Sequence, residues 1–328
     1  MEKYEQLIIK DIKYLQSKLK KSMSERNFDL YARDLCTLYE LARDLNVSIA
    51  KPEVFRKRSI YRADQVHERS IIRNFSESID FIDEYLKNIH LFDHRKYEKT
   101  LEQDETDQSF ELAIDFLRNN DIELLRELKR ISEEEKVVII NKRIHAGDGV
   151  TYESLNTFSP YILLADSNYI DIAHELVHEL AHSSVSMSRR NLKKDVVLNC
   201  KANGLDEVYP HFINILFDDY LKDTDQSISS TFFMNSIKLN YIMSLEDIKD
   251  LLDQEQVDLY EYAKKISYAF GLAIAYIFFD RYKIDKIEAL KELKEFMRNI
   301  EKTTLIRTIE KSNLDKDLLD KKVLLKYI

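Results

Sequence analysis

Residues 171–183 read DIAHELVHELAHS, and this stretch decides how the rest of the chain is interpreted. Its histidines recur at every fourth residue, as His174, His178 and His182. Because an α-helix completes one turn in about 3.6 residues, these imidazoles are expected along one side of a helix. The segment is rich in Leu, Val and Ala and lacks glycine and proline, which favours a regular helix.

The pattern His-Glu-x-x-His occurs twice in this segment, in overlapping registers that share His178. In this pattern two imidazoles one turn apart bind zinc, and the glutamate after the first histidine takes a proton from the attacking water. One register pairs His174 with His178 and makes Glu175 the base. The other pairs His178 with His182 and makes Glu179 the base. Only one register can be the working one.

A carboxylate suited to be the third ligand lies downstream of the histidines. Glu207 comes 25 residues after His182, at the expected start of a second helix that accommodates a proline in its first turn. In the register that ends at His178, the charged Glu179 would crowd the site and oppose polarisation of the water. We therefore expect His178, His182 and Glu207 to bind Zn(II). His174 remains open as a spare ligand, a partner of a ligand, a substrate contact or a structural histidine.

The composition predicts a mainly α-helical protein. Among 328 residues, 44% are hydrophobic and 33% charged, whereas glycine and proline number only four and three. Few turns and long helices follow from this scarcity. The chain is long enough for one large domain or two lobes.

The charge and the cysteines restrict the class of partner and the compartment. A formal net charge of -9 argues against broad binding to nucleic acid or to anionic membranes, because both favour an excess of Lys and Arg. The amino terminus has no signal-peptide core, and no stretch has the length to span a bilayer. Cys36 and Cys200 lie far apart, which fits a reducing compartment. We expect a cytoplasmic protein.

The chain changes character at Lys136, after a succession of amphipathic segments. Residues 1–130 read as amphipathic helices and are expected to form an amino-terminal helical region, with residues 131–328 forming the catalytic region. The runs at 137–140 and 160–164 predict two strands, and residues 145–149 form a loop with two glycines between them. An exposed sheet edge beside the histidine helix would let an extended peptide add as a further strand.

Motifs around the histidines resemble the M3 family of zinc metallopeptidases, the thimet oligopeptidase and oligoendopeptidase F group. The family has a Pro-Tyr-x-Leu-Leu strand before its zinc helix, as residues 160–164 (PYILL) precede residues 178–182 (HELAH) here. Residues 207–221 resemble the family's ligand helix, and residues 266–271 (ISYAFG) resemble its Tyr-Ala-x-Gly helix. The resemblance covers roughly residues 137–280. It implies a helical, two-lobed, zincin-like fold with a small sheet and a substrate cleft.

The sequence departs from the family pattern at several positions. Ala181 replaces a usual glycine, and Asn214 occupies a place often held by a second glutamate. In the family, tyrosines that stabilise the transition state come just before the position that Tyr268 occupies here. In this chain the preceding residues 263–266 read AKKI and include no tyrosine. Tyr260, Tyr262 or Tyr268 could supply that hydroxyl, and we expect it from Tyr262 or Tyr268.

These observations predict a zinc-dependent metalloendopeptidase that hydrolyses oligopeptides. Glu179 would activate the water, and peptides would be the partners, with no nucleic acid and no membrane involved. Two alternatives stay open: a noncatalytic zinc-bearing protein that binds peptides or proteins, and a processing protease dedicated to one target. The sequence does not determine the oligomeric state.

Overall fold

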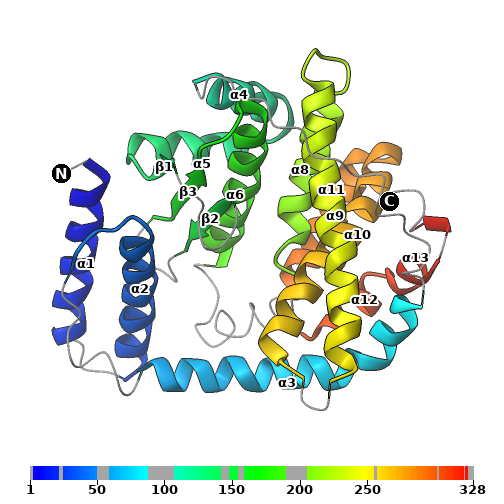
Figure 1. Cartoon of the computed structure of the whole chain (residues 1–328), viewed down its shortest axis with the longest axis horizontal. Helices are drawn as coiled ribbons and strands as arrows, with labels where there is room; N and C mark the ends of the chain where they lie inside the picture. Colours follow the sequence, from blue (N-terminus) through cyan, green and yellow to red (C-terminus); the bar gives the residue numbers. More distant parts are fainter. Residues whose placement is uncertain are drawn as a thin grey trace. The chain divides into compact units, whose positions relative to one another are not determined.

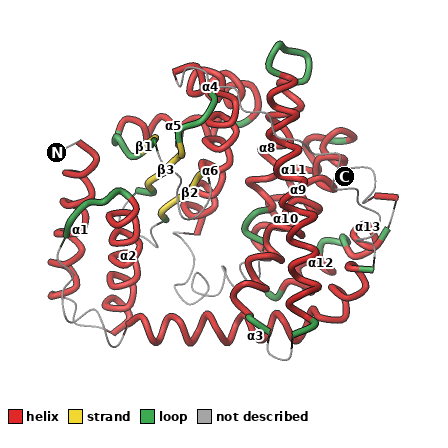
Figure 2. The backbone as a smooth tube through the Cα atoms, in the orientation of Figure 1, coloured by secondary structure: helices red, strands yellow, loops and turns green. Residues whose placement is uncertain are grey.

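The computed structural model describes residues 3–21, 25–49, 59–87, 107–141, 148–153, 159–189, 205–254, 257–300, 303–320 and 322–323 (Figure 1). Helices make up most of this part of the chain, and the three strands are short (Figure 2). The predicted class, mainly α with one small sheet, is confirmed. The helices are α1 (Lys3–Lys21), α2 (Glu25–Asp44), α3 (Ser59–Leu86), α4 (Asp107–Asn120), α5 (Ile122–Glu133), α6 (Tyr169–Arg189), α8 (Val208–Leu221), α9 (Ser227–Leu252), α10 (Leu259–Ile284), α11 (Lys286–Ile300), α12 (Leu305–Lys311) and α13 (Asp315–Leu319).

The sheet contains a parallel and an antiparallel pair. Its strands β1 (Val137–Ile140), β2 (Gly149–Tyr152) and β3 (Tyr161–Ala165) lie in the order β1-β3-β2. The central strand β3 runs parallel to β1, with Val137 opposite Ile162, and antiparallel to β2, with Gly149 opposite Leu164. Strand β2 is therefore an edge strand in the described part of the chain.

Two of the three strands were predicted from their β-branched and aliphatic runs, and these predictions are confirmed. Strand β2 was missed, because its sequence GVTY begins at a glycine and is too short to show an alternating pattern. Gly149 had been assigned to a loop but starts this strand. Of the rest of that predicted loop, Asp148 accepts a hydrogen bond from the Ala165 backbone N–H at 2.7 Å, and residues 145–147 lie outside the described residues.

The chain divides into two compact units. The first contains Met1–Val66 and Gln103–Leu192, and the second contains His67–Glu102 and Lys193–Ile328. Each unit thus combines two stretches that are distant in sequence. The expected separation at residue 130 into a helical and a catalytic region concerns function, and it stays a prediction.

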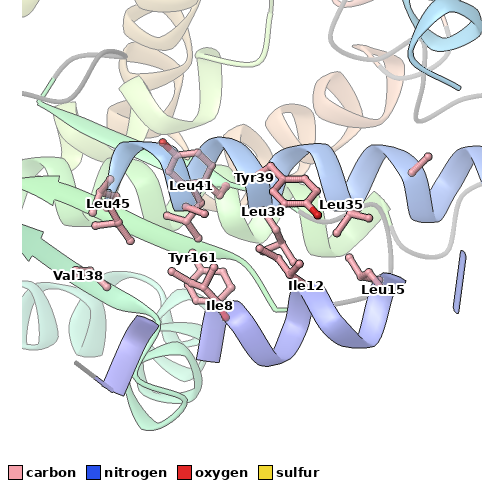
Figure 3. Packing of buried hydrophobic residues seen from close by; sticks show 14 of the residues in the cluster. Ile8, Ile12, Leu15, Leu35, Leu38, Tyr39, Leu41, Leu45, Val138 and Tyr161 are labelled. Carbon is pink, nitrogen blue, oxygen red and sulfur yellow. The ribbon is translucent and has the colours of Figure 1, made fainter. Parts of the chain in front are cut away.

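The core of the first unit joins α1, α2 and the sheet (Figure 3). Helix α1 contributes an apolar stripe at the spacing of one helix face, and α2 contributes a second stripe that packs against it. The labelled residues in Figure 3 include Ile8, Ile12 and Leu15 of α1, Leu35, Leu38 and Leu41 of α2, and Val138 and Tyr161 of the sheet. Polar groups add to this packing, since the Tyr161 hydroxyl donates to Asp11 at 2.8 Å and the Tyr152 hydroxyl donates to Asp44.

The second unit is built around α8, α9 and α10, which pack on one another. The α3 segment from residue 67 onward contributes aromatic side chains, with the Tyr85 ring 4.5 Å from the Phe270 ring of α10. The buried hydroxyls of Tyr85 and Tyr241 hydrogen-bond to each other at 2.5 Å, and burial raises the pKa of both phenols. This pair satisfies two polar groups inside an otherwise apolar interior.

Within the described ranges, none of the helices combines the length and the apolar character that crossing a lipid bilayer requires.

Replacing Ile162 by alanine tests the importance of the central strand. Its side chain is 0% exposed in β3, so Ile162→Ala should lower the free energy of unfolding by about 2–5 kcal/mol through lost burial and a residual cavity. The matched control is Ile287→Ala, since Ile287 is 81% exposed and its loss should cost less than about 0.5 kcal/mol. Urea denaturation measures both variants, and equal effects would contradict this description of the core.

Candidate metal centre

Helix α6 carries the two histidines of the chosen register. The helix begins with a capping contact, because the Asn168 side chain accepts a hydrogen bond from the Asp171 backbone N–H at 2.9 Å. It continues without a break to Arg189, as its composition predicted. His178 and His182 are both half-buried, and their ring centroids lie 5.0 Å apart. The expected placement of these two imidazoles on one side of the helix, one turn apart, is therefore observed, with their rings edge-on to each other.

Glu179 projects from α6 beside strand β2. Its side chain is buried, with 6% of the residue exposed. The Thr151 hydroxyl donates to the Glu179 backbone carbonyl at 2.8 Å, which ties β2 to this turn of the helix. A β-carbon placed on Gly149 would lie only 3.0 Å from Glu179 Cγ. The absence of a side chain at position 149 therefore lets the edge strand pass close to Glu179.

Glu207 immediately precedes α8, as the sequence predicted. It has helical dihedral angles (φ -81°, ψ -10°), and its carbonyl accepts a hydrogen bond from the His211 N–H at 3.0 Å. Pro210 lies in the first turn of the helix, where its missing N–H costs nothing. The helix start therefore holds the Glu207 backbone in a regular conformation.

His178, His182 and Glu207 form a group that could hold a metal ion. Each offers one ligand atom, and these atoms all lie within 4.8 Å of one another. Two imidazoles and one carboxylate are a donor set that suits zinc, which binds such ligands at about 2.0–2.2 Å. The donors thus fit the predicted ion, and three protein ligands would leave a fourth position open.

The competing register, which pairs His174 with His178 and makes Glu175 the base, lies in a different environment. His174 is 0% exposed and does not belong to the group of ligand atoms. Glu175, the base of that register, is half-buried, and one of its carboxylate oxygens lies 2.8 Å from the β-carbon position of Gly149. Among the open alternatives for His174, its complete burial in α6 favours a structural role.

A polar stripe runs along α8 behind Glu207, and sequence reasoning did not recognise it. His211, Asn214 and Asp218 follow Glu207 at intervals that keep them on one face of the helix. His211 is 5% and Asn214 1% exposed, and Asp218 accepts a hydrogen bond from the Ser230 hydroxyl at 2.6 Å. Burial raises the pKa of Asp218, although this hydrogen bond opposes the shift. The spacing alone could have indicated the stripe, because the surrounding positions of α8 are apolar.

The candidate tyrosines occupy different faces of α10. Tyr262 is 3% exposed and packs edge-on against Phe75 of α3, with ring centroids 4.9 Å apart. Burial raises the pKa of its phenol. Tyr268 is half-buried and lies three residues before Gly271, whose β-carbon position would be 2.6 Å from Glu207 Cβ. Residues three apart share a helix face, so Tyr268 lies on the side of α10 that meets Glu207. The Tyr260 side chain lies outside the described residues.

Comparison with known proteins identifies the fold. No family model matches the chain, and no curated protein matches it. Among solved structures, a protein described as a putative oligoendopeptidase F from Bacillus anthracis str. Ames is similar, with a TM-score of 0.50 and 12% sequence identity. The match covers 92% of this chain and 62% of the other, so this chain spans less than two thirds of that protein. At this identity the similarity concerns the fold alone.

Metal binding distinguishes the two registers. His182→Ala and Glu207→Ala each remove one of the three donor atoms. Loss of a residue that only contacts a metal ligand lowers affinity by about 10- to 100-fold, so loss of a ligand itself should lower zinc affinity by more than that. His174→Ala should retain one equivalent of zinc, although loss of a buried side chain will lower stability. Isothermal titration with zinc measures all three variants. Loss of binding in His174→Ala together with retention in His182→Ala would favour the other register.

Proposed function

We propose that this chain is a zinc-dependent endopeptidase that hydrolyses oligopeptides. The observation that carries the proposal is the convergence of the ligand atoms of His178, His182 and Glu207 within 4.8 Å, with Glu179 next to the first histidine. This combination is the donor set and base of the His-Glu-x-x-His peptidases. The resemblance to M3 metallopeptidases and the fold shared with the Bacillus anthracis protein support the same class.

Zinc, when bound, supplies a Lewis acid that polarises the scissile carbonyl and lowers the pKa of water. Glu179 accepts the proton from the attacking water as the new carbon–oxygen bond forms. The same carboxyl then donates this proton to the departing amine as the carbon–nitrogen bond breaks. Burial against β2 keeps the Glu179 side chain close to one orientation, so the base is positioned before the substrate arrives.

Tyr268 is the residue to which we assign stabilisation of the developing oxyanion. It shares a face of α10 with Gly271, which lies directly against Glu207, and its side chain is only half-buried. Tyr262 precedes Gly271 by nine residues, which is half a turn away on a helix, and it packs against α3 instead. Of the two predicted tyrosines, we therefore propose Tyr268 as the residue that stabilises the oxyanion.

The substrate is proposed to bind as an extended strand along β2. No other strand of the described chain pairs with the outer side of β2, and this strand lies directly against α6. Backbone hydrogen bonds to an edge strand recognise peptides with little regard for sequence, which suits a broad oligopeptide substrate. The tie between Thr151 and Glu179 would place such a peptide beside the base.

Replacement of Glu179 by glutamine tests the base. Glu179→Gln keeps the size and burial of the side chain but cannot accept a proton, so peptide cleavage should fall by about 10²- to 10⁴-fold. Zinc affinity should stay within a few-fold of the wild type, because Glu179 is not a ligand. Mass spectrometry of products from a mixed peptide pool measures cleavage. The wild type treated with a chelator and reloaded with zinc serves as the control.

Two outcomes would contradict the proposed activity. Full cleavage by Glu179→Gln would remove this residue as the base. A zinc-loaded wild-type protein that cleaves no peptide of a broad pool would instead favour the noncatalytic peptide-binding protein.

Replacement of tyrosines by phenylalanine tests the oxyanion donor. Tyr268→Phe removes only the hydroxyl, so kcat should fall by about 10²- to 10³-fold with little change in zinc affinity. Tyr262→Phe is the matched control on the same helix and should keep kcat within a few-fold. Steady-state kinetics with a fluorogenic peptide measure both, and a larger loss in Tyr262→Phe would reverse the assignment.

A further inference from the structure

Glycine is scarce in this chain, and one glycine lies where a helix normally disfavours it. Only four of 328 residues are glycine. Gly271 lies inside α10, a helix of 26 residues that extends well beyond it on both sides. Glycine in a helix interior is less stable than alanine, because it loses more backbone freedom on folding. Its presence at this position therefore requires a specific reason.

The reason is the contact between α10 and the start of α8. A β-carbon on Gly271 would lie 2.6 Å from Glu207 Cβ, 3.2 Å from its carbonyl carbon and 3.4 Å from its Cα. All three are atoms whose positions the backbone determines, so rotation of a side chain cannot relieve the overlap. Alanine at position 271 would have to displace the backbone of Glu207 itself.

We propose that Gly271 is a positioning residue for the third metal ligand. The missing side chain lets the Glu207 backbone rest directly on α10, and this contact determines where the carboxylate lies. The inference rests on the proposed function for the identity of the ligand, but the packing of Gly271 on Glu207 can be tested separately. Both residues belong to the second unit, which holds α8 and α10 together by extensive mutual packing.

The first experiment compares Gly271→Ala with a control on the same helix. Gly271→Ala should fold, as judged by circular dichroism, and bind zinc about 10- to 100-fold more weakly than the wild type, as an outer-partner substitution does. In the absence of metal its Tm should fall, whereas an unconstrained glycine-to-alanine change in a helix raises stability. Ala263→Gly, the reverse change in α10, should lower Tm but leave the zinc Kd within about twofold of the wild type.

Two results would overturn the positioning role. One is a wild-type zinc Kd in Gly271→Ala. The other is an equal weakening of zinc binding by Ala263→Gly, which would mean that affinity follows helix stability in general.

The second experiment removes the β-carbon that Gly271 accommodates. In a Glu207→Gly background, the loss of Tm caused by Gly271→Ala should shrink to less than half of its value in the wild type, because the closest overlapping atom is absent. An undiminished loss of Tm in that background would overturn the inference. If Gly271→Ala alone does not fold, folding of the double variant supports the inference and failure of the double variant overturns it.

This second experiment uses metal-free protein, so it tests the packing of Gly271 on Glu207 separately from the proposed zinc peptidase function. A wild-type protein that binds no zinc would refute the proposed function, and the Tm comparison would still decide whether Gly271 positions Glu207.

Discussion

The proposed metal site has one geometric requirement, that the carboxylate of Glu207, which precedes α8, lies within reach of the two imidazoles of α6. The imidazoles meet their part of the requirement through the helical repeat alone, since His178 and His182 are one turn apart. The local sequence does not determine where Glu207 lies. Its backbone precedes α8 and lies against Gly271 of α10. In the proposed site, the position of this ligand would therefore depend on how closely the start of α8 approaches α10.

A partly buried polar network contacts the histidine helix at Ser183, one residue beyond His182. Ser183, directly after His182, donates to Glu127 of α5 at 3.2 Å, and Arg130 binds the same carboxylate through its Nε at 3.0 Å. Arg130 also donates to Ser159, just before β3, at 2.5 Å. These contacts link α5, α6 and the residues that lead into the central strand β3.

Helix α8 places polar side chains in a largely apolar interior. His211 and Asn214 are almost fully buried, and buried polar side chains are costly unless they take part in interactions. At the far end of the stripe, the Asp218 carboxylate is fixed by Ser230 of α9. The side of α8 that bears Glu207 is thus likewise tied to its neighbouring helix.

The sequence by itself determined what depends on local periodicity. The histidine helix, the strands at 137–140 and 161–165, the position of Glu207 at a helix start and the mainly helical class follow from patterns of a few residues. The tertiary structure alone decided that Glu175 and Glu179 both lie against the edge strand at Gly149, and which face of α10 meets Glu207. It also revealed β2, whose four residues carry no readable pattern. The physical reason is that hydrophobic and polar spacing encodes the conformation of one segment, whereas the distance between segments depends on the volumes of side chains far apart in sequence.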